Sequence, residues 1–161
     1  GGLVITLYMV NNLTDKMLTD YATVNDYYFH TMHHEFTHIL NQKIPYDENF
    51  QHISEGNYVS GDWYQKRTSA ANKKGFVTPY AMSEPLEDFA EMLSVYVTTS
   101  PSGWQKIMDT AGTTGAPFIQ AKLDMVRAYM KNSWKLDIDE LRSIVLRRAS
   151  EINHLDLNQL K

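Results

Sequence analysis

The sequence predicts an α+β fold that is mostly helical, with a small N-terminal sheet, a long helix and a C-terminal helical part. Residues 3–10 are β-branched, aromatic or otherwise apolar and lie between Gly-Gly and Asn-Asn, which is typical of a strand. From residue 24 to residue 42 the apolar positions change to helical spacing. Helical stripes then recur through the second half of the chain. We therefore expect a small sheet over a helical body.

The first predicted helix covers residues 24–42. Thr23 followed by Asp26 resembles a capping box at its start. Ile44-Pro45 predicts its end, because the residue before a proline avoids the α conformation. Apolar residues recur at helical spacing along this segment: Tyr28, Met32, Phe36, Ile39 and Leu40.

Local signals also divide the rest of the chain into elements. Ser83 and Pro85 predict a cap residue and a first-turn proline for a helix that ends before Pro101. The predicted elements are an ordered loop over 45–61, a short helix over 62–74 closed by Gly75, a helix over 83–99, a loop over 110–117, and helices over 118–132 and 137–153. No internal repeat is visible, so one domain over residues 1–161 is the simplest organisation.

Composition narrows the classes of protein. A chain of 161 residues has the size of one domain that folds without disulfides. The formal net charge of −4 argues against nucleic-acid binding, and the lack of cysteine excludes a thiol nucleophile or a cysteine zinc site. No apolar run approaches the ~20 residues of a transmembrane helix. Because the chain starts at Gly1-Gly2, we expect it to be a fragment of a longer precursor.

The motif His34-Glu35-Phe36-Thr37-His38 has the HExxH pattern and falls inside the first predicted helix. Residues four apart lie on one helix face, so His34 and His38 can bind one metal ion. Glu35 lies about 100° around the helix axis, beside that ion, where its carboxylate can take a proton from water. The motif therefore predicts a Zn²⁺ site with Glu35 as the general base.

A catalytic zinc site needs a third protein ligand and an open fourth position. An acidic run in the helix over 83–99 offers candidates: Glu84, Glu87, Asp88 and Glu91. Glu87 and Glu91 share one face, so one can bind zinc while the other accepts a hydrogen bond from a ligand histidine. We prefer Glu87 as the zinc ligand and Glu91 as the residue that accepts a hydrogen bond from a ligand histidine. Glu84 and Asp88 stay open as alternative ligands. For His30, which drifts off the shared face, we expect an outer or surface role.

The HExxH motif together with the segment over 80–91 resembles the gluzincin group of zinc peptidases, whose fold is zincin-like. Within that group the chain is similar to the substrate-import-associated zinc metallohydrolase lipoproteins of Bacteroidetes-type bacteria, over about residues 3–100. The same segment is similar to that of anthrax lethal factor. The resemblance implies Tyr80 as oxyanion stabiliser, Glu87 as third ligand and Glu91 in the outer shell. It also implies a cell-envelope, outer-membrane or cell-surface location and import-complex partners.

These residues predict a zinc-dependent metallopeptidase. The predicted strand over 3–10 could pair with an extended peptide, which favours a polypeptide substrate. The alternative from another class is a zinc-containing binding or assembly module of a cell-surface import complex with little turnover. A zinc amidohydrolase acting on a non-peptide amide is a weaker third hypothesis.

Overall fold

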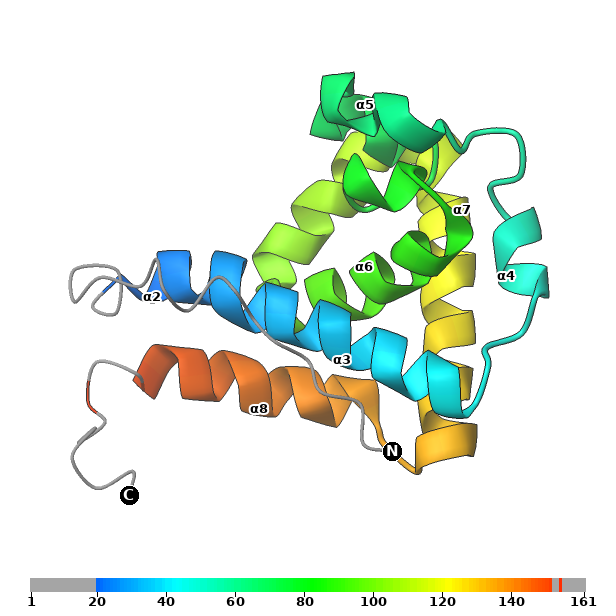
Figure 1. Cartoon of the computed structure of the whole chain (residues 1–161). Coiled ribbons are helices and arrows are strands. Elements are labelled where there is room, and N and C mark those ends of the chain that lie inside the picture. Colours follow the sequence, from blue (N-terminus) through cyan, green and yellow to red (C-terminus); the bar gives the residue numbers. More distant parts are fainter. Residues whose placement is uncertain (1–19, 152–153, 155–161) are drawn as a thin grey trace.

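The computed structural model describes residues 20–151 and residue 154, and its regular elements are helices (Figure 1). In chain order they are α2 (Tyr21–Thr23), the π-helix η2 (Val24–Phe29), α3 (His30–Lys43), α4 (Asn49–His52), the 3₁₀ helix η3 (Ser60–Gln65), α5 (Thr68–Lys73), the 3₁₀ helix η4 (Tyr80–Met82), α6 (Pro85–Thr98), α7 (Pro101–Trp134) and α8 (Ile138–Glu151). None of these described helices is long and apolar enough to cross a membrane.

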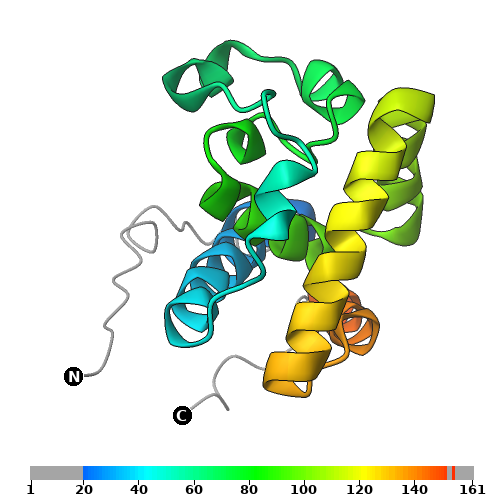
Figure 2. The ribbon, with the colours of Figure 1, turned by 90° about the vertical axis from the view of Figure 1, so that its right-hand side faces the viewer.

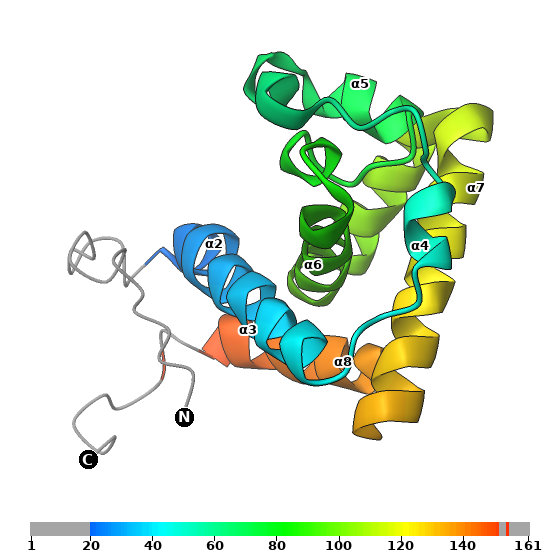
Figure 3. The same ribbon diagram turned by 45° about the vertical axis from the view of Figure 1, so that its right-hand side comes forward.

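The predicted α+β class is wrong: residues 20–151 form helices and contain no strand. The segment over 3–10, which we expected to supply the N-terminal sheet, lies outside the described residues. Helices alone bury the core, because α6 is surrounded by α3, α7 and α8 (Figure 3). Every residue of α6 from Asp88 to Thr98 is buried. A helix that is buried all round needs only other helices as its cover.

The helix over 24–42 is confirmed as η2 followed by α3, but of its apolar stripe Leu40 is buried while Met32 and Phe36 are exposed. Met32 and Phe36 are 48% and 50% exposed. The buried residues of α3 are His34, Thr37, Leu40 and Asn41. The helix therefore turns a mostly polar face, which includes His34, toward the interior, where the carboxylates of α6 lie.

The helix ends follow local chemistry, with two corrections. Asp20 caps the first helix, because its carboxylate accepts hydrogen bonds from the Ala22 N–H at 3.2 Å and the Thr23 hydroxyl at 2.6 Å. The predicted Thr23 capping box is thus wrong, since Thr23 makes no cap hydrogen bond. Ser83 does not cap α6 either, because its hydroxyl donates to the carbonyl of Tyr80. The end of α3 at Lys43 and the first-turn position of Pro85 are as predicted.

The loop predicted over 110–117 is wrong, because α7 continues through it with a single break at Gly112. Gly112 has φ 62° and ψ −163°, a conformation that side chains disfavour, and the two parts of α7 run in different directions (Figure 2). Gly115 packs against α5 so closely that an added Cβ would lie 2.0 Å from the carbonyl oxygen of Asn72. The glycines in this segment therefore serve a bend and a helix contact.

A buried ion pair crosses the core between α6 and α7. Nζ of Lys122 lies 2.6 Å from Oδ2 of Asp88, and both side chains are fully buried. The Tyr58 hydroxyl donates to the same Asp88 oxygen at 2.9 Å, and Lys122 donates to the carbonyl of Gly75 at 2.8 Å. This pair fixes α6, the helix that carries the acidic run, against α7 and two connecting segments.

Candidate metal centre

Helices α3 and α6 bring three candidate ligands together. Nε2 of His38 lies 3.0 Å from Nε2 of His34, one helical turn away. Oε2 of Glu87, from α6, lies 2.8 Å from Nε2 of His34 and 3.4 Å from Nε2 of His38. His34 is buried, while His38 and Glu87 are partly exposed. These three donor atoms thus form a compact triangle at the edge of the interior.

The triangle fits a zinc ion. Tetrahedral zinc binds nitrogen and oxygen at about 2.0–2.1 Å, which separates neighbouring donors by roughly 3.3 Å. The observed separations of 2.8, 3.0 and 3.4 Å are close to that value. A cleft of about 650 Å³ borders Glu35, His38 and Glu87, so one side of the triangle is accessible. The donor set therefore matches three protein ligands with an open fourth position.

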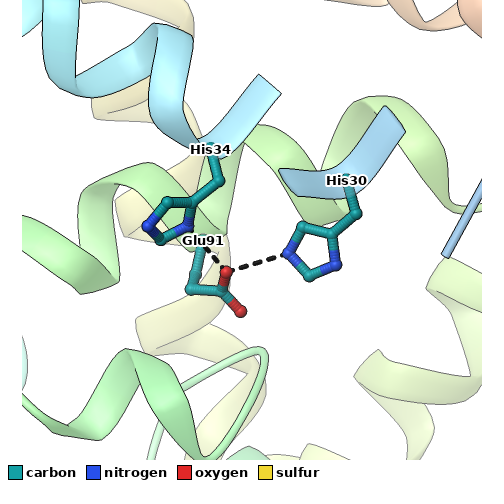
Figure 4. Close-up of side chains that lie close together, drawn as sticks. All are labelled: His30, His34 and Glu91. Atoms are coloured by element: carbon teal, nitrogen blue, oxygen red, sulfur yellow. Dashed lines mark hydrogen bonds and ion pairs between the residues drawn. The ribbon is translucent and has the colours of Figure 1, made fainter. Parts of the chain in front are cut away.

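Glu91 contacts Nδ1 of His34, the ring nitrogen that does not face Glu87 (Figure 4). Its Oε1 lies 2.8 Å from Nδ1 of His34 and 2.8 Å from Nε2 of His30, and its Oε2 accepts a hydrogen bond from Thr78 at 2.6 Å. Because Nδ1 of His34 donates to this carboxylate, Nε2 faces the triangle. Nδ1 of His38, by contrast, is buried without a hydrogen-bond partner among the residues described.

The carboxylates control the charge of the metal-free centre. Burial lowers the pKa of His34, but hydrogen bonds to Glu87 and Glu91 outweigh burial and raise it to about 9. Burial raises the pKa of Glu91, and the hydrogen bonds from His30 and His34 more than reverse this effect and lower it to about 2. Hydrogen bonds from His34 and His38 also lower the pKa of Glu87. At neutral pH the two carboxylates are ionised and His34 is protonated.

Glu35 and Tyr80 also lie close to this triangle. Glu35 lines the cleft, and no described residue donates a hydrogen bond to its carboxylate. The ring centroid of Tyr80 lies 5.7 Å from that of His34 and 4.9 Å from that of Trp63. Burial, followed by the negative charge of Glu87, raises the pKa of Tyr80 to about 12, so its phenol stays a hydrogen-bond donor at neutral pH.

Thr78 links Glu91, the hydrogen-bond partner of His34, to the segment that carries Tyr80. Its hydroxyl donates to Glu91 and accepts the Ala81 N–H at 3.1 Å, which ties the start of η4 to α6. The sequence did not predict a role for Thr78 or Asn41, nor the ion pair between Lys122 and Asp88. No motif or residue spacing in the sequence predicts these contacts.

The other acidic candidates lie elsewhere. Glu84 precedes α6 and is exposed, and Asp88 points into the core toward Lys122. Neither belongs to a group of described side chains close enough to share a metal ion. Glu91 belongs to such a group with His30 and His34, where its shared oxygen contacts both rings. The structure therefore brings Glu87, and not Glu84 or Asp88, to the HExxH histidines.

An HExxH helix faced by a glutamate from a second helix supplies the donor set of a zinc site. The chain belongs to the family described as "Putative zinc-binding metallo-peptidase", whose family model matches residues 1–139. A crystal structure described in the same terms, from Bacteroides caccae ATCC 43185, is 45% identical with a TM-score of 0.87. The match covers 97% of this chain and 59% of that one. No curated protein matches. Family membership confirms Zn²⁺ as the cofactor.

Proposed function

We propose that this protein is a zinc-dependent metallopeptidase in which His34, His38 and Glu87 bind zinc and Glu35 is the general base. The observation that carries the proposal is the free carboxylate of Glu35, which lines the cleft next to His38 and Glu87. A zinc site with a purely structural role needs neither a free carboxylate nor an open side. The family description supports a peptide as the substrate.

The chain's own residues suffice for the proton transfers of peptide hydrolysis. Zinc, when bound, activates water and polarises a carbonyl group as a Lewis acid. Glu35 accepts a proton from the attacking water and passes it to the leaving amine. Tyr80, protonated at neutral pH, donates a hydrogen bond to the carbonyl oxygen as that atom gains negative charge. Such a donor contributes about 3 kcal/mol to stabilisation of the transition state.

The experiment compares zinc-loaded wild type with Glu35→Gln on a mixed set of peptides, with products read by mass spectrometry. Wild type should cleave, and Glu35→Gln should lose about 10²- to 10⁴-fold in rate while keeping its zinc. The control is Glu55→Gln, an exposed carboxylate that forms an ion pair with His52, and it should keep the wild-type rate. Equal rates for wild type and Glu35→Gln would overturn the proposed role of Glu35.

Zinc-loaded wild type that cleaves no peptide would favour the alternative, a zinc-containing binding or assembly module. The cell-surface location, lipid anchor and import-complex partners implied by the resemblance stay predictions.

A further inference from the structure

The cleft beside the metal centre extends well beyond the reacting groups. Its volume is about 650 Å³, and its lining residues come from α3, the connection to α4, α4 itself and the start of α6. Figure 3 shows how these elements are arranged. Glu35, His38 and Glu87 lie at one side of it. A peptide with its scissile bond at the metal centre would place a neighbouring side chain in this space.

Asn41 is a buried polar residue in the wall of this cleft, and its amide atoms are enclosed rather than open to the cleft. The residue lines the cleft and is only 7% exposed. Neither its Oδ1 nor its Nδ2 has a hydrogen-bond partner among the residues that the structure describes. A buried amide without partners destabilises the fold, typically by about 1–3 kcal/mol, unless something else supplies them. Because Asn41 follows His38 by three residues on α3, it lies on the metal side of the cleft.

The remaining walls suit a long cationic side chain. Pro45, Tyr46 and Leu86 supply apolar surface, and Glu48 supplies a carboxylate. No lysine or arginine is among the described residues that line the cleft. Lysine and arginine combine an aliphatic stem with a charged head, so they match a wall that offers both apolar surface and a carboxylate.

Negatively charged side chains also act on Tyr46 in the cleft wall. Burial, then the negative charges of Asp88, Glu84 and Glu48, raise the pKa of Tyr46 to about 12. Glu48 in the cleft wall would attract a cation and repel an acidic side chain.

We propose that this cleft selects peptides with a lysine or arginine next to the scissile bond. Glu48 pairs with the cationic group, and Pro45, Tyr46 and Leu86 pack against the aliphatic stem of the same residue. This inference rests on the proposed function and adds a substrate class to it.

The test measures kcat/KM of the zinc-loaded protein for peptides that differ at one position at a time, with Lys, Arg, Leu or Glu at each. At one position beside the cleaved bond, Lys and Arg should exceed Leu by about tenfold, which corresponds to about 1.4 kcal/mol for the charge pair with Glu48. The ratio should fall toward one in Glu48→Gln and invert in favour of Glu in Glu48→Lys. Glu140→Gln, an exposed carboxylate on α8, is the matched control and should keep the wild-type ratio.

Cleavage without a Lys or Arg preference, or a preference that survives in Glu48→Lys, would overturn the inference and leave the proposed function intact. A protein that cleaves nothing would refute the proposed function, and peptide binding to zinc-loaded Glu35→Gln then decides the inference alone. Binding about tenfold tighter for the Lys peptide than for its Leu counterpart, lost in Glu48→Lys, would support the cationic subsite. Equal binding would contradict it.

Discussion

Nδ1 of His34 lies 2.8 Å from Oε1 of Glu91, behind the face that His34 presents to the metal centre. The same carboxylate accepts hydrogen bonds from His30 and Thr78, so Glu91 joins α3, α6 and the segment before η4. This single buried group sets the tautomer of His34 and the position of Tyr80. Its removal should affect zinc binding directly.

Glu91→Ala should weaken zinc binding. Loss of the outer partner of a metal-binding histidine typically weakens metal affinity by about 10- to 100-fold, because the ring orientation and tautomer are no longer fixed. Competition for zinc with a coloured chelator measures this affinity. Glu84→Ala, an exposed carboxylate just before the same helix, is the control and should bind as tightly as wild type. Unchanged affinity in Glu91→Ala would argue against the outer role.

Zinc affinity should depend strongly on pH. In the metal-free protein the pKa of His34 is raised from 6.5 to about 9, so zinc must displace a proton from His34 at neutral pH. The affinity should rise about tenfold per pH unit from pH ~7 and level off above the raised pKa. Titration calorimetry in two buffers with different ionisation enthalpies should detect about one released proton. A flat affinity over this range would contradict the assigned protonation state.

The same shift predicts how pH changes the stability of the metal-free fold. A raised histidine pKa stabilises the fold fully below the unfolded value of 6.5, and this contribution is lost as pH rises through about 9. Urea unfolding of the metal-free protein at several pH values measures the loss, and His34→Asn should remove this pH dependence.

Tyr80→Phe should separate catalysis from metal binding. Removing one oxyanion donor typically reduces kcat by about 10²- to 10³-fold. The zinc content should not change, because Tyr80 is not among the described groups that could hold the ion. Steady-state kinetics with zinc analysis measure both, and Tyr64→Phe, 68% exposed, is the control. A variant with the wild-type kcat would remove Tyr80 from the mechanism.

Lys122→Met should destabilise the fold by about 3–5 kcal/mol, because it leaves the buried Asp88 charge without its cation. Urea unfolding measures the change. Lys106→Met, an exposed lysine on the same helix, should change stability by less than about 0.5 kcal/mol. A loss as small as that of the control would show that Asp88 does not depend on Lys122.

The sequence predicted what depends on neighbouring residues. Pro45, Pro85 and Pro101 restrict their own backbone and that of the preceding residue, and the ends of α3 and α6 follow from them. The HExxH spacing likewise places His34 and His38 together, whatever the rest of the fold does.

Features that depend on distant contacts were not predictable in the same way. The Gly- and Thr-rich stretch over 110–117 forms a loop by propensity, yet packing of Gly115 on α5 makes it part of α7. Only part of the apolar stripe of α3 is buried, because the carboxylates of α6 draw the histidine face inward. The Lys122–Asp88 pair joins two helices, and neither residue marks the other in the sequence.

Zinc stoichiometry by elemental mass spectrometry tests the central claim most directly. Wild type should hold about one zinc per chain, Glu87→Ala should lose it or bind it far more weakly, and Glu84→Ala should retain it. Wild type without zinc after incubation with excess metal, or Glu87→Ala with full zinc content, would contradict the assignment of His34, His38 and Glu87 as the zinc ligands.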